Sequence, residues 1–278
     1  MARKRITQRF PWLLPLRTRQ RKLCFYLKMR LDQNRYAKTR QTEKLPVTLF
    51  SSSCQMMNPD TGFPMVYQEN KVHNLKLAAK PIDGLLIRPG ETFSFWVSAK
   101  NADREEPYRE GLTEIDGKLT TAPGGGLCMI TNLLFWVLLH SPLTIVERHG
   151  HDRKDFPEPP SDAPLGVDAT IAEGWLDLKV RNDTEKTFQI GVSFDDTHIT
   201  GEVRTAHDDG IIYRVYNGPV TYFRREDGEI IESVEIIRER VSRESGEAFS
   251  AKVMYCNQCE IGYPLPEGTE VVEKGQEV

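Results

Sequence analysis

Residues 120–140 read TTAPGGGLCMITNLLFWVLLH, and the rest of the chain is best interpreted outward from this stretch. Three consecutive glycines, Gly124, Gly125 and Gly126, permit backbone conformations that are closed to other residues. The apolar run that begins at Cys128 predicts a helix with the thiol at its N-terminus. The N–H groups and the dipole of a helix N-terminus favour the thiolate, the reactive form of cysteine. A tight turn followed by a small buried cysteine is the alternative.

The composition is that of an ordinary globular protein of 278 residues, with 39% hydrophobic and 28% charged residues. A chain of this length can bury one sizeable core or two modest ones. Five cysteines are an odd number in a chain too long to need disulfides, which indicates a reducing compartment, so we expect a cytoplasmic protein. We find no export signal and no run of the ~20 apolar residues that a transmembrane segment needs.

The charges are segregated along the chain. Residues 1–40 contain thirteen Lys or Arg and one acidic residue, Asp32, whereas the remainder carries a net charge of about −15. Residues 17–40 predict a basic amphipathic helix. Such a helix can dock on the acidic remainder or make a peripheral contact with an anionic membrane, and the sequence leaves both open. We expect no nucleic-acid partner.

The pattern predicts an α+β fold in which a Cys-bearing helix packs on an antiparallel sheet, with a basic N-terminal helical segment and a β-rich C-terminal extension. The predicted elements are a helix at 69–80, a strand, Pro-Gly turn and strand at 85–96, a loop or lid at 100–118, strands at 143–151 and 167–171, an antiparallel meander over 176–203, and a strand or short helix at 231–241. The predicted divisions are a basic helical segment at 1–44, an α+β domain at 45–205, a β-rich extension at 206–265 and a disordered acidic tail at 266–278.

A cysteine at a helix start, followed by histidines on one strand and an acid on another, is the order found in papain-like folds such as the NlpC/P60 peptidases and transglutaminases. There the helix favours the thiolate, an imidazole transfers the proton, and the acid orients the imidazole. The candidate catalytic residues are Cys128, His149 or His151, and Asp168. Because alternate residues of a strand share a face, both histidines are expected to project the same way.

Other kinds of site fit the same region. His149 and His151 with Cys128 or Asp168 would suit zinc or copper, although we expect no cofactor. The glycine turn and the helix start could bind an anion through backbone N–H groups. The expected recognition surface is this turn together with three aromatic residues, Phe93, Phe95 and Trp96, of which the first two are expected on one strand face. The pair Cys256 and Cys259 forms a lone CxxC, which is a weak metal or redox signal.

Several segments resemble the VanW family. They are GGGLC at 124–128, PGETFSF at 89–95, IVERHGH at 145–151, GVDAT at 166–170 and LDLKVRNDT at 176–184, and MARKRITQRFP at 1–11 and IGYPL at 261–265 extend the resemblance over nearly the whole chain. The resemblance implies a setting in vancomycin (glycopeptide) resistance and cell-wall precursor metabolism, and it implies no molecular activity. The family usually has Gln after the motif cysteine, where this chain has Met129, so a polar contact such as an oxyanion donor would be missing there.

The sequence therefore predicts an accessory protein of glycopeptide resistance with two candidate molecular roles. One role is Cys-His acyl transfer or hydrolysis on peptidoglycan-related peptides, as in a papain-like hydrolase or transferase. The other is non-catalytic binding of such a cell-wall precursor peptide or of a partner protein. The distance between the thiol and the two imidazoles separates these roles.

Overall fold

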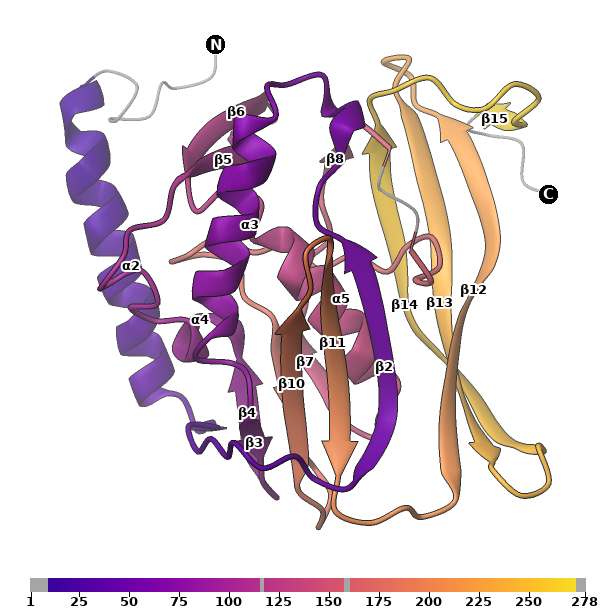
Figure 1. Cartoon of the computed structure of the whole chain (residues 1–278). Helices are drawn as coiled ribbons and strands as arrows, with labels where there is room; N and C mark the ends of the chain where they lie inside the picture. Colours follow the sequence, from indigo (N-terminus) through magenta and orange to yellow (C-terminus); the bar gives the residue numbers. More distant parts are fainter. Residues whose placement is uncertain (1–9, 116–117, 158–160, 274–278) are drawn as a thin grey trace.

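The structure is a computed structural model that describes residues 10–115, 118–157 and 161–273. At its centre, helix α5 (Cys128–Leu139) packs on one face of a four-stranded antiparallel sheet (Figure 1). In spatial order the strands of this central sheet are β2 (Val47–Gln55), β11 (His198–Thr205), β10 (Phe188–Phe194) and β3 (Leu85–Ile87). The predicted α+β fold, with its cysteine-bearing helix on an antiparallel sheet, is confirmed.

Helix α5 is a core helix, since nine of its twelve residues are buried. A helix that is apolar on all sides is typically covered on all sides. Helix α5 lies close to the sheet: a Cβ atom added to Gly201 of β11 would be only 3.0 Å from Cγ of Leu133. Only three of its residues are half-buried, and all lie near its N-terminus: Cys128, Met129 and Asn132. The fold therefore leaves the cysteine end of this helix accessible.

A second sheet and a hairpin complete the central part of the chain. The second sheet contains, in spatial order, β1 (Arg35–Tyr36), β4 (Glu91–Ser94), β9 (Lys179–Arg181) and β7 (Thr144–Glu147). The hairpin consists of β5 (Glu110–Ile115) and β6 (Lys118–Pro123), and helix α3 (Val66–Ala79) packs against it. Because β6 runs directly into Gly124–Gly126, the hairpin, α3 and α5 meet at the glycine turn.

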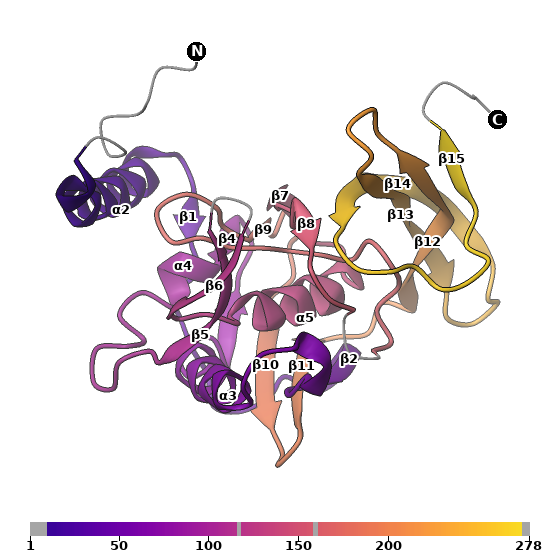
Figure 2. The same ribbon diagram turned by 90° about the horizontal axis from the view of Figure 1, so that it is seen from above.

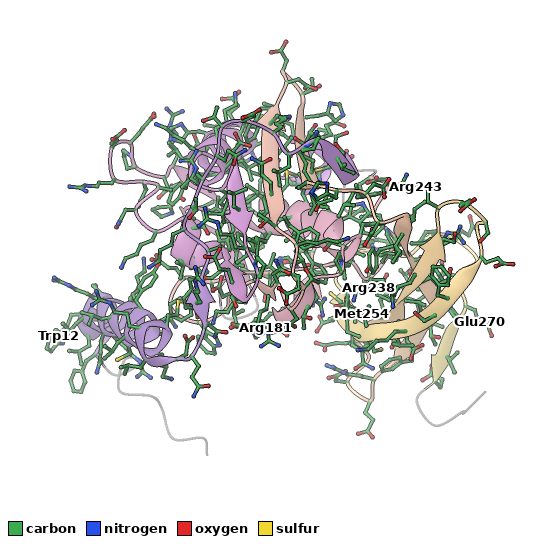
Figure 3. The ribbon with its side chains drawn as sticks, turned by 90° about the horizontal axis from the view of Figure 1, so that it is seen from below. Trp12, Arg181, Arg238, Arg243, Met254 and Glu270 are labelled. Atoms are coloured by element: carbon green, nitrogen blue, oxygen red, sulfur yellow. The ribbon has the colours of Figure 1, made fainter. Side chains whose placement is uncertain are left out.

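The C-terminal residues form a separate, strongly twisted sheet beside the centre (Figure 2). In spatial order its strands are β15 (Val271–Glu273), β12 (Ile211–Arg224), β13 (Ile230–Ser242), β14 (Ala248–Ile261) and β8 (Arg153–Lys154). Arg238 lies between this sheet and the centre (Figure 3) and donates hydrogen bonds to the backbone oxygens of Ser141 and Leu143, at 2.9 and 3.2 Å. The β-rich extension is thus tied to the end of helix α5.

The basic N-terminal helix α2 (Leu14–Leu31) follows a short helical turn, η1 (Pro11–Leu13), and lies along one edge of the molecule (Figures 1 and 2). An ion pair between Lys22 and Glu173 holds it to the body, and Tyr26 donates a hydrogen bond to the same carboxylate at 2.9 Å. Docking on the acidic remainder therefore involves one face of the helix. Among the described residues, no helix is both long and apolar enough to cross a membrane.

Several predicted elements differ from the structure. The basic helix ends at Leu31, well before residue 40, and the loop expected at 100–118 contains strand β5, with residues 116 and 117 outside the described ranges. The strand at 143–151 ends at Glu147, and 167–171 has no regular secondary structure. Within the tail predicted to be disordered, Val271–Glu273 pairs with β12, while 274–278 lie outside the described ranges. The ambiguous stretch at 231–241 belongs to strand β13.

The strand expected to continue to Trp96 ends at Ser94. The Ser94 hydroxyl accepts a hydrogen bond from the backbone N–H of Val97 at 3.1 Å and caps the short helix α4 (Phe95–Ser98). Serine is a favoured cap because its oxygen satisfies an N–H that the first helical turn leaves unpaired. The shared strand face predicted for Phe93 and Phe95 therefore does not form, because Phe95 already belongs to the helix.

Candidate active site

The structure brings together three of the four predicted catalytic residues. Cys128 opens helix α5, and the imidazole of His151 lies beside its thiol. Nδ1 of His151 is 2.6 Å from Oδ1 of Asp168, and the backbone N–H of His151 donates to Oδ2 of the same carboxylate at 2.6 Å. Because Nδ1 and the backbone N–H both face the acid, Nε2 is the ring nitrogen left for the thiol. The order of the three groups is thiol, imidazole, carboxylate.

The electrostatics of this cluster favour the charged form of each group. Burial, the largest influence, would raise the pKa of the Cys128 thiol, but hydrogen bonding and charge from His151, with Thr170 and the backbone of Ile171, lower it below the usual range. Burial likewise opposes the charge on His151, but Asp168 and then Cys128 raise the pKa of the imidazole well above its usual range. The pKa of Asp168 is lowered despite its burial, chiefly by His151. These directions favour a thiolate–imidazolium pair next to a carboxylate.

The loop that carries Asp168 is held against helix α5 by side chains of that helix. The Thr131 hydroxyl donates to the backbone oxygen of Ala169 at 2.5 Å, and Oδ1 of Asn132 accepts from the Ala169 N–H at 2.6 Å. The next residue, Thr170, places its hydroxyl oxygen 3.3 Å from Sγ of Cys128. The thiol and the acid are therefore positioned by neighbouring residues of one loop, clamped to the helix that carries the thiol.

The C-terminal sheet supports the same loop from the other side. The guanidinium of Arg148 donates to the backbone oxygen of Asp168 at 2.6 Å, is hydrogen bonded to Asn257 of β14, and lies 4.3 Å from the ring centre of Tyr255. The Tyr255 hydroxyl donates to the backbone oxygen of Gly166 at 2.9 Å. The β-rich extension thereby takes part in positioning Asp168.

The sequence did not point to these supporting residues. Asn257 lies inside the CxxC segment, whose cysteines diverge: Cys256 is exposed and Cys259 is buried, as residues three apart on a strand must face opposite sides. Arg148, Thr131 and Asn132 carry no signal except their place within the two motifs. Their roles arise from contacts between segments that are far apart in the chain.

His149 pairs with Glu147. Its Nε2 lies 3.1 Å from Oε1 of Glu147, and the chain has left strand β7 two residues earlier, so the alternation expected for the two histidines does not apply. Each imidazole pairs with a different carboxylate. Among residues 10–115, 118–157 and 161–273, no group of three His, Cys, Asp or Glu side chains is arranged to hold a metal ion.

The glycine turn mainly allows the hairpin, α3 and α5 to pack closely together. The N–H groups of Gly124 and Gly125 donate to the backbone oxygens of Arg109 and Ala122, at 3.1 and 3.0 Å, so two of the three predicted anion-binding donors are already used. Asn74 of α3 donates from Nδ2 to the oxygens of Arg109 and Gly125, at 2.9 and 3.1 Å. Within the described ranges, the N–H groups of Gly126, Leu127 and Cys128 donate no hydrogen bond. Only the last part of the turn and the helix start can therefore present N–H groups to a ligand.

The predicted recognition surface is wrong for two of its three aromatic residues. Phe93 and Phe95 have no exposed surface and belong to the hydrophobic core. Trp96 is also largely buried, with its indole N–H donating to the backbone oxygen of Leu176 at 2.9 Å, but it does line the cleft. Phe93 is buried because all four residues of β4 are buried, and Phe95 is buried because α4 places it in the core.

Three of the four candidate catalytic residues line a cleft of about 2240 Å³, whereas Asp168 is fully buried. Its lining includes Cys128, His149, His151 and Thr170, together with the glycine turn and part of helix α2. A cleft of this size can hold an extended peptide segment. The cluster thus has a nucleophile, a proton-transfer group and an orienting acid at a surface that a large substrate can reach.

Comparison with known proteins agrees with the resemblance seen in the motifs. The family described as VanW like protein matches residues 70–204. The Vancomycin B-type resistance protein VanW of Enterococcus faecalis (strain ATCC 700802 / V583) is 54% identical over 276 residues, 99% of this chain and 100% of that protein. The Uncharacterized protein YoaR of Bacillus subtilis (strain 168) is 33% identical over 114 residues, 41% of this chain and 36% of that protein. No solved structure matches the chain. With a full-length relative at this identity, the chain belongs to the VanW family.

Proposed function

We propose that this protein is a cysteine acyltransferase or hydrolase in which Cys128 is the nucleophile, His151 the general acid and base, and Asp168 the group that orients His151. The observation that carries the proposal is the arrangement of thiol, imidazole and buried carboxylate at a helix N-terminus inside an open cleft. Structural cysteines lack this combination of a lowered pKa and access to a large ligand.

The reaction divides into two balanced steps. Sγ of Cys128 attacks a substrate carbonyl carbon, and the C–N bond breaks as His151 gives its proton to the leaving amine, which forms a thioester on Cys128. His151 then takes a proton from water or from an acceptor amine, which attacks the thioester carbonyl, and the C–S bond breaks to release the Cys128 thiolate beside the protonated His151. The N–H groups at the start of α5 are suitably placed to stabilise the oxyanion, so a side chain at Met129 is not required.

The proposed substrate class is supported by the name of the full-length relative. Because the full-length Enterococcus faecalis relative is named as a vancomycin B-type resistance protein, we infer that this chain is an accessory protein of the same resistance. Vancomycin acts on the cell wall, and the amide bonds available there to a thiol nucleophile are those of peptidoglycan-related peptides. The proposed substrate is therefore a cell-wall precursor peptide.

The test of this proposal is a covalent adduct. The native protein, incubated with a mixture of peptidoglycan-derived peptides and quenched in acid, is expected to gain the mass of an acyl group on Cys128, as measured by intact and peptide mass spectrometry. Cys128→Ser should abolish the thioester, and His151→Ala should reduce its formation by roughly 100-fold, as removing a general base does.

Cys24→Ser is the matched control, since it removes an exposed thiol outside the cleft and should leave the adduct unchanged. Peptides that protect Cys128 from alkylation without ever forming an adduct would contradict the catalytic proposal. That result would favour the non-catalytic binding of cell-wall peptides.

We also propose a peripheral contact between helix α2 and an anionic membrane surface. Four leucines at a spacing of seven and four residues, which places them on one side of a helix, are 49 to 77% exposed: Leu16, Leu23, Leu27 and Leu31. The residues that face the body lie on the other side: Lys22, Phe25, Tyr26 and Met29. Helix α2 is thus apolar on two faces, of which the body covers one.

Cations flank the leucine face on both sides. At 100° per residue, Arg17, Arg21 and Lys28 lie along one border, and Arg19 and Arg30 along the other. Trp12 continues the exposed apolar surface at the outer edge of the molecule and is 73% exposed (Figure 3). An apolar stripe bordered by cations suits the headgroup region of an anionic bilayer. Since the cytoplasmic leaflet carries anionic lipid and the odd cysteine number suits a reducing compartment, we place this contact on the cytoplasmic side.

Vesicle binding tests the contact. The triple variant Leu16→Ser, Leu23→Ser, Leu27→Ser is expected to lose at least tenfold in cosedimentation with vesicles containing phosphatidylglycerol, because each leucine loses its apolar transfer free energy. Wild-type binding should also weaken as salt is raised. The control is Phe249→Ser with Val253→Ser, two exposed apolar residues of β14. Equal binding by the triple variant and the wild type at low salt would exclude the contact.

A further inference from the structure

A buried lysine without a carboxylate partner lies at the candidate active site. Lys71 of helix α3 is 8% exposed and lines the same cleft as Cys128. A Cβ atom on Gly126 would overlap Cγ of Lys71, so the lysine side chain crosses the glycine turn two residues before the nucleophile. Within the described ranges, its ammonium group forms no ion pair or hydrogen bond. Lysine is almost never buried unless it is paired, so an anionic ligand would stabilise this ammonium group.

Burial disfavours the charged form of this ammonium group. Desolvation lowers the pKa of Lys71 to about 8, and the electrostatic influence of Cys54 on β2 offsets part of this shift. A carboxylate placed beside the ammonium would favour its charged form and offset the desolvation. The lysine is therefore more readily protonated when an anion is bound.

A second donor lies one helical turn before Lys71. Gln68 is 3% exposed, and its Oε1 accepts a hydrogen bond from the backbone N–H of Asn58 at 3.1 Å, which fixes the orientation of the amide. The amide nitrogen then faces away from Asn58, and no described residue accepts a hydrogen bond from it. Because residues three apart lie on one helix face, Gln68 and Lys71 present their donors to the same part of the cleft.

We propose that Lys71 and Gln68 form a subsite for a carboxylate group of the peptide on which Cys128 acts. One cation and one neutral donor suit a single-charged carboxylate better than a doubly charged phosphate, which typically meets several cations. The place of Lys71 over the glycine turn puts the bound carboxylate to one side of the scissile bond, so the subsite selects peptides with a free carboxylate close to the reacting carbonyl. This inference rests on the proposed acyl transfer for the identity of the ligand, but the subsite itself can be tested without any turnover.

The test uses two alkylating reagents of similar size and different charge. Iodoacetate carries a carboxylate and iodoacetamide does not, so the ratio of their rates at Cys128 reports the attraction of an anion into the cleft. Lys71→Met is expected to lower this ratio by roughly tenfold, as the loss of one unit charge near the reacting centre would do. Methionine has a similar length and removes a costly buried charge, so the fold should be kept, which circular dichroism can verify.

The matched control is Lys80→Met, the same change at the exposed C-terminal end of α3, which should leave the ratio within about twofold. An unchanged ratio in Lys71→Met would overturn the subsite. If Cys128 reacts with neither reagent in the native protein, the proposed nucleophile fails instead, so the two failures are distinguishable. Among peptides that form an adduct, replacing the free carboxylate with an amide should slow the wild type and have no further effect on Lys71→Met.

Discussion

Replacing His151 with alanine is expected to slow the alkylation of Cys128 by roughly 10- to 100-fold at pH 6. An ordinary thiol has a pKa of about 8.5 and is less than about 1% thiolate at that pH. In this protein His151 holds the pKa of Cys128 below the usual range, against the burial that would raise it. Removing the imidazole leaves the burial in place, so the thiolate population falls. A thiolate of low pKa is also a weaker nucleophile, which limits the expected difference in alkylation rate to roughly 10- to 100-fold.

The alkylation rates of the wild type and of His151→Ala should also differ in their dependence on pH. Because His151 lowers the pKa of the Cys128 thiol, the wild-type rate should depend less on pH between 6 and 8 than the rate of His151→Ala, which should rise steeply as its thiol titrates. The measurement is alkylation by iodoacetamide with a mass readout for each of the five cysteines. His149→Ala is the matched control, since its imidazole pairs with Glu147, and it should stay within about twofold of the wild type. A Cys128 that reacts only after denaturation would contradict the whole arrangement.

Replacing Gly125 with alanine is expected to destabilise the protein by about 3 kcal/mol, which is at the upper end of the usual cost of overpacking. A Cβ atom at this position would overlap the backbone carbonyl of Gly111 in β5. The backbone of the hairpin cannot move aside without disturbing Asn74, whose side chain ties Arg109 and Gly125 to helix α3. The glycine is therefore required for a close approach of two backbones.

Thermal or urea unfolding measures this loss, and Gly218→Ala is the matched control. Gly218 lies in strand β12, and the nearest atom to a Cβ added there is 3.7 Å away, an ordinary contact. Its replacement should change the free energy of unfolding by less than about 0.5 kcal/mol. Equal stability of the two variants would show that the turn can open at Gly125, and the packing role assigned to the glycine turn would be wrong.

The sequence by itself determined the features that depend on neighbouring residues. The apolar run after Cys128 requires a helix, and the glycines before it require a turn, so the N-terminal position of the thiol followed from local rules. The alternation over 187–194 and 198–203 predicted the pair β10 and β11, which the structure contains with only small differences at the ends. The α+β class followed from the same patterns.

Only the tertiary structure decided which groups meet the thiol. His149 and His151 were equivalent in sequence. Which imidazole meets the thiol depends first on where strand β7 ends. It depends also on the hydrogen bonds that the backbone and ring of His151 make to Asp168, a buried residue of another loop. The unpaired charge of Lys71 was likewise invisible, because burial is a property of the surroundings of a side chain. Local propensity fixes the elements, whereas contacts between residues far apart in the chain fix the partners of each polar group.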